Sequence, residues 1–495
     1  MRKLWINCVI SALLSFTTLH GQGIDNLWMM GYESWAGIPF GGIEMDFNTG
    51  SMVLSYRPKQ MNFTTTSLTY CNEMGNVLFY TNGVYIANAQ GDTMMNGSGL
   101  SPSYYTDVVG WNGLFIPQAA LAIPWPDSPS KYFLFHNTID DSIAYSYKQY
   151  FSEIDMSLDG GLGAVVSKNN ILVSDTLICG RLTAAKHANG RDWWVVFHGG
   201  KSDKYYVYLV DPSGINLFNV QHIGGILTSW PGQVCFSPDG SRFALYDARN
   251  DLHLLDFDRC SGYFSNHIHV SINDSADGGG VAFSSSSQVL YVSSARYIYQ
   301  FDMTASNIAS TQTTVAVWDT FYSPAPPAAT VFYLAQLAPD NKIYVSSQNG
   351  VLSMHVIDHP DSLGLACGVC QHCIPLPAYN FTTIPSHPNY HLGALGSSVC
   401  DSLPTGIRKP LNEQGDAYTI FPNPVRDKLY VRSTTQNQSV EIIIYNSLLQ
   451  ALSLPITLIN QVEYSEVNTS RLVPGVYFLE IVSKGERGVK RFVKN

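Results

Sequence analysis

The sequence predicts an all-β protein, in which a β-propeller of about seven blades is followed by a small immunoglobulin-like β-sandwich. Three observations predict this fold class. Hydrophobic residues make up 45% of the 495 residues and charged residues only 13%, which is too few charges for the exposed faces of a helix-rich protein. Residues 23–402 show almost no 3.6-residue apolar periodicity, and short runs of Val, Ile, Tyr, Phe and Trp lie there between Gly, Asn and Asp turns. The third observation is an internal repeat.

A unit of two aromatic-rich strands and two polar turns recurs with a period of about 53 residues. One such unit leaves both faces of its sheet uncovered, whereas units packed around an axis cover each other and leave only short edges. We expect a seventh blade to be closed from residues 42–56 and 379–395. The six internal units begin at Gly75, Lys131, Gly190, Asp239, Ser287 and Asp340.

Two turns carry a more specific pattern. The stretches FSPDGSRFALY (236–246) and LAPDNKIYVSS (337–347) resemble the propeller repeat in which a Pro-Asp-Gly or Pro-Asp-Asn turn precedes an inner strand. Proline presets the first corner of such a turn, and Gly or Asn tolerates the positive φ of the second. We therefore interpret Asp239 and Asp340 as turn residues rather than catalytic acids.

The segment RDWWVVF contains two adjacent tryptophans, Trp193 and Trp194. Successive side chains of a strand point to opposite faces, so one indole must enter each face of the sheet. Because neighbouring blades cover both faces of an internal blade, we expect both rings to be buried. The alternative is a binding rim, in which at least one indole is exposed.

The first 22 residues have the three parts of a secretory signal peptide. Arg2 and Lys3 precede an apolar run over 4–19, and small or polar residues follow at 21–22. An uncleaved membrane anchor is the alternative, but the run is shorter than the roughly 20 residues that a span requires. No later segment is long enough to cross a bilayer as a helix. The net charge of −10 repels phosphate backbones, so we expect no nucleic-acid partner.

Cysteine usage agrees with export. Cys8 lies in the predicted signal peptide, and the other eight form an even set that we expect to pair as disulfides outside the cytoplasm. The cluster CGVCQHC at 367–373, which includes His372, also has the spacing of a zinc or iron–sulfur site. A metal would need a distant or strained fourth ligand, so we favour disulfides and expect neither a metal nor another cofactor. The eight candidates are Cys71, Cys179, Cys235, Cys260, Cys367, Cys370, Cys373 and Cys400.

The composition changes near the C-terminus, where residues 417–495 are basic on balance and the preceding chain is acidic. We expect residues 403–416 to be a linker and 417–495 to fold separately as a compact sandwich of short strands. Four blocks there, FPNPVRDKLYV, VEIIIYNSLLQ, LVPGVYFLEI and GVKRFVK, resemble the type A C-terminal sorting domain of the type IX secretion system. An ordinary immunoglobulin-like binding module is the alternative. The motif residues of the resemblance are Pro422, Asn423, Pro424, Pro474, Gly475 and Tyr477.

The resemblance implies a Bacteroidota-type bacterium and the type IX secretion machinery as a partner. It also implies transit through the periplasm, followed by delivery to the outer-membrane surface or the medium. Further motifs across most of residues 70–370, including GNVLFYTNGVYI, KHANGRDWW and QLAPDNKIYV, resemble large secreted propeller proteins of the same bacteria. That group has no established enzymatic activity, so this second resemblance supports a fold more than a function.

Well-defined catalytic motifs are missing. The sequence contains no G-x-S-x-G, H-E-x-x-H, G-x-x-x-x-G-K-[ST] or strand-linked G-x-G-x-x-G motif. In KHANGRDWW, His187, Arg191 and Asp192 would supply a proton donor, an anion clamp and a carboxylate to a lyase-like site. The alternative, which we favour, is an Arg191–Asp192 ion pair that stabilises a turn. The loop at 273–280 offers oxygen ligands for Ca²⁺, but their spacing does not match an EF-hand.

These observations favour a secreted or cell-surface propeller that binds a ligand or partner. A carbohydrate or a protein is a physically reasonable ligand because 29 Tyr and nine Trp are available. The alternative function is a surface hydrolase or lyase that acts on polysaccharide. We favour the binding protein because no catalytic motif is present.

Overall fold

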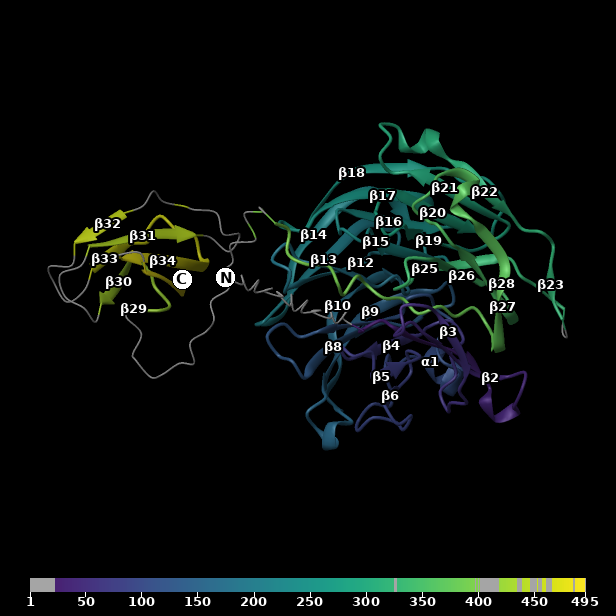
Figure 1. The fold of residues 1–495 in the computed structure, drawn as a ribbon. Helices are drawn as coiled ribbons and strands as arrows, with labels where there is room; N and C mark the ends of the chain where they lie inside the picture. The colour runs from purple at the N-terminus through teal and green to yellow at the C-terminus, as the bar shows by residue number, and fades with distance from the viewer. Residues whose placement is uncertain are drawn as a thin grey trace, which may run out of the picture. The chain divides into compact units, whose positions relative to one another are not determined.

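Figure 1 shows the computed structural model of the chain. It describes residues 23–495 except 325–326, 397, 399, 401–417, 434–438, 446–451, 453–455, 460–464, 484–485 and 495. The chain divides into two compact units, Met1–Leu403 and Pro404–Asn495, called unit 1 and unit 2 below. The predicted signal peptide (1–22) and linker (403–416) lie outside the described residues and stay predictions.

The described part of unit 1 is built mainly of seven antiparallel sheets that follow one another along the chain (Figure 1). Neighbouring strands of each sheet are consecutive in sequence, as in a meander. The first sheet contains β1 (Leu27–Tyr32), β2 (Gly41–Asp46) and β3 (Val53–Tyr56). The second contains β4 (Leu68–Cys71), β5 (Val77–Thr81) and β6 (Ile86–Asn88).

The other five sheets have four strands each. The third contains β7 (Ala120–Pro124), β8 (Lys131–His136), β9 (Tyr145–Asp155) and β10 (Ala164–Ile178). The fourth contains β11 (Thr183–Lys186), β12 (Trp193–His198), β13 (Ser202–Asp211) and β14 (Gly214–Leu227). The fifth contains β15 (Gly232–Phe236), β16 (Arg242–Asp247), β17 (Asp251–Asp258) and β18 (Tyr263–Val270). The sixth contains β19 (Gly279–Phe283), β20 (Val289–Ser294), β21 (Tyr297–Asp302) and β22 (Thr313–Val317). The seventh contains β25 (Phe332–Leu337), β26 (Ile343–Ser347), β27 (Val351–Ile357) and β28 (Val369–Asn380).

Short elements occupy the connections. The strands β23 (Tyr322–Ser323) and β24 (Ala328–Ala329) form a small separate hairpin. The helix α1 (Tyr104–Val109) is capped by Ser103, whose side chain accepts from Thr106 N. The 3₁₀ turns are η1 (Ser34–Ala36), η2 (Gly110–Asn112), η3 (Asp159–Gly161), η4 (Ile308–Thr311) and η5 (Gly364–Cys367).

The first strands of successive sheets pack side by side. β1 contacts β4 and β4 contacts β7, while β11, β15, β19 and β25 contact one another in that order. The last sheet also lies against the first, because β28 contacts β1, β2 and β3. One hydrophobic cluster joins these two sheets, with Trp28 and Met45 from the first and Tyr344 and Met354 from the last. The beginning and the end of the series of sheets are therefore neighbours in space.

The adjacent tryptophans of β12 are both buried, as the sequence predicts. Trp193 and Trp194 are each 1% exposed. Trp193 packs in one hydrophobic cluster with Val195, and Trp194 packs in another with Val196. The side chains thus alternate between two covered faces of the strand. This burial contradicts the binding-rim alternative for the segment.

The two Pro-Asp turns also form as expected. Gly240 and Asn341 occupy positive-φ corners, with φ of 72° and 63°. Ser241 N donates to Asp239 Oδ1 at 3.0 Å, and Tyr344 OH donates to Asp340 Oδ2 at 2.9 Å. Each aspartate is therefore engaged by its own turn and the strand that follows it.

The predicted closure of a seventh blade by the C-terminal segment is wrong. The sheet that includes residues 42–56 is formed by β1, β2 and β3 alone. Residues 381–395, all of which the structure describes, contain no strand. Pro385 and Pro388 explain the difference, because proline has no N–H to donate to a strand ladder. The segment still contributes Ile384 to the cluster that joins the first and last sheets.

Unit 2 contains two antiparallel sheets within its described residues. One contains β29 (Tyr418–Phe421), β30 (Lys428–Ser433) and β33 (Ser465–Asn468). The other contains β31 (Ser439–Tyr445), β32 (Ile456–Ile459), β34 (Gly475–Ser483) and β35 (Glu486–Lys494). A single hydrophobic core joins them, with Leu429 and Val431 from the first sheet and Ile442 and Leu479 from the second.

Residues of the predicted sorting motif lie at the strand ends of unit 2. Asn423 Oδ1 accepts a hydrogen bond from Val493 N at 2.9 Å. Tyr477 is buried, and its hydroxyl donates to Val473 O at 2.8 Å. The remaining motif residues are Pro422, Pro424, Pro474 and Gly475. Across the described ranges of both units, every helix is too short or too polar to span a membrane.

Candidate functional site

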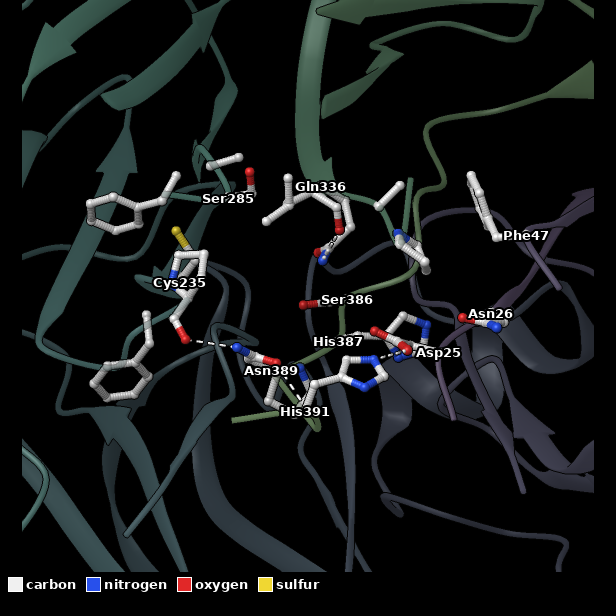
Figure 2. A pocket seen from close by; sticks show the side chains of 18 of the residues that line it. Asp25, Asn26, Phe47, Cys235, Ser285, Gln336, Ser386, His387, Asn389 and His391 are labelled. Atoms are coloured by element: carbon white, nitrogen blue, oxygen red, sulfur yellow. Dashed lines mark hydrogen bonds and ion pairs between the residues drawn. The ribbon is translucent and has the colours of Figure 1, made fainter. Parts of the chain in front are cut away.

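Residues 386–391 and the first strands of four sheets line a cavity of about 950 Å³ in unit 1. Wall residues come from β11, β15, β19 and β25, and from the turns at 47–50 and 338–341. Figure 2 shows side chains from these different elements around the cavity. A volume of this size is typical of small-molecule sites. We call this cavity the central pocket.

Residues 386–391 form one wall of the central pocket and are fastened to two sheets. Gln118 Nε2 donates to Ser386 Oγ at 2.7 Å. Asn389 Nδ2 donates to Pro238 O at 2.7 Å, as the dashed line in Figure 2 marks. Because the segment belongs to no ladder, its position depends on such side-chain bonds rather than on strand pairing.

Two buried glutamines, Gln118 just before β7 and Gln233 on β15, join different sheets beside the pocket. Gln118 donates from Nε2 to Val234 O and accepts from Val234 N, both at 2.8 Å, as a paired strand would. Gln233 makes the same two contacts with Ala335, at 2.6 and 2.9 Å, and accepts from Val281 N at 3.2 Å. These bonds fix the spacing of the strands and give the pocket rigid walls.

His387 is the polar residue of the pocket whose hydrogen bonding is incomplete. Within the described residues, neither of its ring nitrogens has a hydrogen-bond partner, and both are buried. Burial lowers the pKa of His387 to about 4, although the nearby Asp25 carboxylate opposes the shift. The imidazole is therefore neutral at pH 7, with one donor and one acceptor. Buried polar groups normally have partners, so a rotation of this ring toward a bound molecule or a water would be favourable.

Asp25 and His391 form a second polar feature at the pocket (Figure 2). His391 Nε2 lies 2.9 Å from Asp25 Oδ1, and this hydrogen bond raises the pKa of His391. The His391 side chain is 41% exposed and the Asp25 side chain 15%. A carboxylate that holds an imidazole in this way orients the ring and stabilises its protonated form.

The pocket lining combines apolar side chains with amide and hydroxyl groups and has few charges. Among the described residues that line it, none is Lys or Arg, and the acids are Asp25 and Glu73. Such a surface does not attract a phosphate or a carboxylate, because it offers no permanent positive charge. It suits an uncharged molecule that is rich in hydroxyl groups. The amide and hydroxyl side chains of the wall include Asn26, Asn48, Gln336, Asn341, Ser386 and Asn389.

The predicted residues His187, Arg191 and Asp192 lie together in one turn, outside the lining of the central pocket. Arg191 donates from Nε to Asp192 Oδ1 at 2.7 Å and from Nη2 to Oδ2 at 3.2 Å. Asn189 Nδ2 donates to Asp192 Oδ2 at 2.7 Å, and Asn189 N donates to His187 Nδ1 at 3.1 Å. Burial lowers the pKa of His187, and Asp192 opposes the shift. The geometry is that of the ion-paired turn.

Sequence reasoning missed Asp25, His387 and His391 as site residues. The local signal is SHPNYH at 386–391, where two histidines and two asparagine or serine side chains surround a proline. Asp25 and His391 are 366 residues apart in the chain. Only the packing of the first sheet against the end of unit 1 brings them together.

The predicted Cys/His cluster contains a disulfide, Cys370–Cys373. These two sulfurs bind each other, so they are not free to ligate a metal. His372 Nε2 lies 2.9 Å from Asp319 Oδ2. Across the part of the chain that the structure describes, no group of three or more His, Cys, Asp or Glu side chains is arranged to hold a metal ion.

A second disulfide, Cys260–Cys400, fastens the chain after it leaves the central pocket. Next to it, the buried Arg259 guanidinium donates to Gly393 O at 2.5 Å and to Lys186 O at 2.9 Å. The segment that forms the pocket wall is therefore held on its C-terminal side by both a covalent bond and a buried cation.

The prediction that all eight cysteines pair is wrong for half of them. The four remaining thiols are free and lie in different parts of unit 1, three of them in separate hydrophobic clusters. A disulfide usually has Cα atoms roughly 4.4–6.8 Å apart, and sequence parity carries no information about that separation. The free thiols are Cys71, Cys179, Cys235 and Cys367.

Residues 419–495 match the family described as the secretion system C-terminal sorting domain. This match indicates export by the type IX secretion system, to the cell surface or the medium. It covers unit 2 only and carries no information about the activity of unit 1. None of the curated proteins matches the sequence.

Several solved structures are similar to this chain at low identity. A protein from Lactobacillus plantarum is 13% identical, with a TM-score of 0.41, over 73% of this chain and 98% of its own. A putative 6-phosphogluconolactonase from Bacteroides fragilis is 11% identical, with a TM-score of 0.42, over 72% and 96%. Another from Bacteroides uniformis is 11% identical, with a TM-score of 0.38, over 90% and 99%. Similarity at this level says nothing about what this chain binds or catalyses.

Proposed function

We propose that residues 23–402 form a seven-bladed propeller that binds an uncharged, hydroxyl-rich ligand, such as a carbohydrate, in the central pocket. Unit 2 is an immunoglobulin-like sorting domain, which a Bacteroidota-type bacterium uses to deliver the protein to its surface or the medium. Seven consecutive sheets support the blade count, and so does the core that the first and last sheets share. The signal peptide at 1–22 supplies entry to the periplasm.

The single observation that carries the ligand proposal is the chemistry of the central pocket. Its described lining combines many amide and hydroxyl side chains with a neutral His387 whose ring nitrogens lack partners. Hydroxyl groups donate and accept hydrogen bonds, and both roles are available at a neutral imidazole. Because the lining contains neither Lys nor Arg, a phosphorylated or carboxylated ligand would be bound less well than its neutral counterpart.

Arrays of glycans and of peptides, probed with the purified full-length protein, test this proposal. We expect neutral glycans to bind and His387→Leu to weaken that binding about tenfold or more, because one or more hydrogen bonds are lost. The matched control is His222→Ala, since His222 is an exposed histidine outside the pocket. Binding of peptides alone, or glycan binding that His387→Leu leaves intact, would contradict the proposal.

A second candidate function is a polysaccharide hydrolase or lyase, and the Asp25–His391 pair favours it. The pair lies at the same pocket, and an imidazole held by a carboxylate is a common general base. Turnover of neutral polysaccharides, for a hydrolase, and of uronate-containing ones, for a lyase, measured by reducing ends released, separates the enzyme from the binding protein. Loss of turnover in both His391→Ala and Asp25→Asn would establish an enzyme whose active site is the central pocket. Loss of turnover in His187→Ala would place the active site at the turn of residues 187–192 instead.

Deleting residues 417–495 tests the export part of the proposal. Unit 1 has its own hydrophobic clusters, so the truncated protein should fold and accumulate in the periplasm without its sorting domain. Fractionation of cells and immunodetection of surface protein measure the outcome. Normal surface display of the truncated protein would show that the export signal lies outside residues 417–495.

A further inference from the structure

A groove of about 660 Å³ lies on the surface of unit 1, away from the central pocket. Its two tryptophans, Trp35 on η1 and Trp111 on η2, are 74% and 54% exposed. Exposure of this extent is costly for an indole, whose burial usually contributes strongly to stability. We call this surface the tryptophan groove. Its lining residues are Ser34, Trp35, Pro58, Lys59, Gln60 and Trp111.

The two sides of the tryptophan groove are held in place by a shared asparagine. Asn62 Oδ1 accepts from Glu33 N, next to η1, at 2.7 Å. Asn62 Nδ2 donates to Asn112 Oδ1, next to Trp111, at 3.3 Å. The backbones that carry the two indoles are therefore linked before any ligand arrives, which lowers the entropy lost on binding.

The one charge in the described lining of the tryptophan groove is paired, and its partner Glu44 also faces Arg57, an exposed residue outside the lining, at 3.6 Å. Lys59 is its charged lining residue, and Lys59 Nζ pairs with Glu44 Oε1 at 2.5 Å. Only 12% of the Lys59 side chain is exposed. The groove therefore presents apolar ring faces with polar neighbours, Ser34 and Gln60, and no unpaired charge in its described lining. It is complementary to an uncharged molecule with both apolar faces and hydroxyl groups.

The apolar surface continues beyond the groove along α1. Tyr104 and Val108 are one helical turn apart and are 85% and 64% exposed. The helix leads directly into η2 and Trp111. An extended ligand of several repeating units would fit a surface of this length better than a single small molecule.

We propose that the tryptophan groove binds a neutral polysaccharide, with a sugar ring stacked on each of Trp35 and Trp111. The axial C–H groups of a pyranose form an apolar face that packs against an indole, and its equatorial hydroxyls reach Ser34 and Gln60. This site is independent of the central pocket. Asp25 precedes β1 and lines the pocket, whereas Trp35 follows β1, and a strand of this length spans about 20 Å.

Affinity electrophoresis of the full-length protein tests the proposal with four soluble polysaccharides. A β-glucan, a xylan and a mannan are the neutral probes, and polygalacturonate is the anionic probe. We expect at least one neutral probe to retard the protein. Trp35→Ala and Trp111→Ala should each weaken that binding about tenfold or more. Tyr263→Ala is the matched control, because Tyr263 is an aromatic residue of β18 that is 50% exposed and lies outside the groove.

Two further measurements keep this result distinct from the central pocket and from protein contacts. Trp35→Ala and Trp111→Ala should weaken retardation by the same factor in a His387→Leu background as in wild type, so failure of the pocket proposal does not affect this one. Sedimentation of wild type and Trp35→Ala shows whether the groove joins two copies of the chain. The proposal is overturned if no neutral probe retards the protein, if only polygalacturonate does, if both tryptophan variants bind normally, or if Trp35→Ala changes the mass.

Discussion

The segments 187–192 and 386–391 contain similar residue types, yet their polar groups are satisfied to different degrees. In the first, Arg191 and Asn189 bond both oxygens of Asp192, and His187 accepts from a backbone N–H. In the second, the ring nitrogens of His387 have no partner in the described residues. A saturated network rigidifies a fold, whereas an unsaturated one leaves binding capacity. The comparison assigns stability to the turn and supports the recognition that we propose for the pocket wall.

We expect the largest loss of stability from the substitution of Trp194, which follows the turn in the chain. Trp194 is 1% exposed, and its indole N–H donates to Arg259 O at 2.7 Å. Trp194→Ala should lower the free energy of unfolding by about 3–5 kcal/mol, through lost burial and the cavity left behind. Chemical denaturation measures the change. The matched control is the exposed Trp35, whose replacement by Ala should leave unfolding nearly unchanged; equal losses in the two variants would refute the assignment of stability to the turn.

The next effect concerns the carboxylate that organises the turn. Asp192→Ala should cost about 1–3 kcal/mol, because the partly buried hydrogen bonds from Asn189 and Arg191 lose their acceptor. Asp192→Asn keeps the volume and one acceptor oxygen, so it should cost less. Thermal unfolding of the two variants ranks them. An Asp192→Ala variant as stable as wild type would mean that the network is dispensable.

Features that depend on close neighbours in the chain are predictable from the sequence. The alternation of Trp193 and Trp194 requires only the period of a strand, and the turn at Asp239 requires only its Pro-Asp-Gly triplet. The sorting domain is predictable because its four blocks occur in order within one short segment. The closure by residues 379–395 fails because two prolines outweigh an otherwise suitable position.

The central pocket is not predictable in this way. Its wall combines first strands of several sheets with a segment far away in the chain, so no local pattern marks it. The same limit applies to the disulfide Cys260–Cys400, whose cysteines are separated by 140 residues. His387 is a further case, because its lack of partners depends on the packing around it rather than on its neighbours in the sequence.

The third prediction concerns a substitution that should not destabilise the protein, in contrast to Asp192→Ala. His387→Leu should leave the protein as stable as wild type or stabilise it by about 1 kcal/mol, because it removes a buried polar group without partners. The gain should grow at acid pH. The folded-state pKa of about 4 lies below the ordinary value of about 6.5, so wild type loses stability as the pH falls from 6.5 towards 4. Unfolding at several pH values measures it, and a destabilised variant at every pH would show that the imidazole has a partner.

His391 provides the internal control for that titration. Its hydrogen bond to Asp25 raises its pKa, so its contribution to stability is present below about pH 6.5 and is lost as the pH rises through the folded-state value. His391→Ala should therefore destabilise the protein more at pH 5 than at pH 9. The two histidines of one short segment thus have opposite pH dependence, and a common direction would contradict the environments assigned to them.

The smallest expected effect belongs to Arg191. Its side chain is 43% exposed, and it pairs with Asp127 at 3.0 Å as well as with Asp192. Solvent screens such a pair, so Arg191→Ala should cost less than about 1 kcal/mol, and salt should reduce the difference further. Asp192 keeps its bond from Asn189 in this variant, which is why the turn should survive. Unfolding in low and high salt measures the cost, with Arg191→Lys as the conservative control. A loss of polysaccharide binding or turnover in Arg191→Ala, with stability unchanged, would instead assign the guanidinium a role as an anion clamp and would move the functional site from the pocket to the turn.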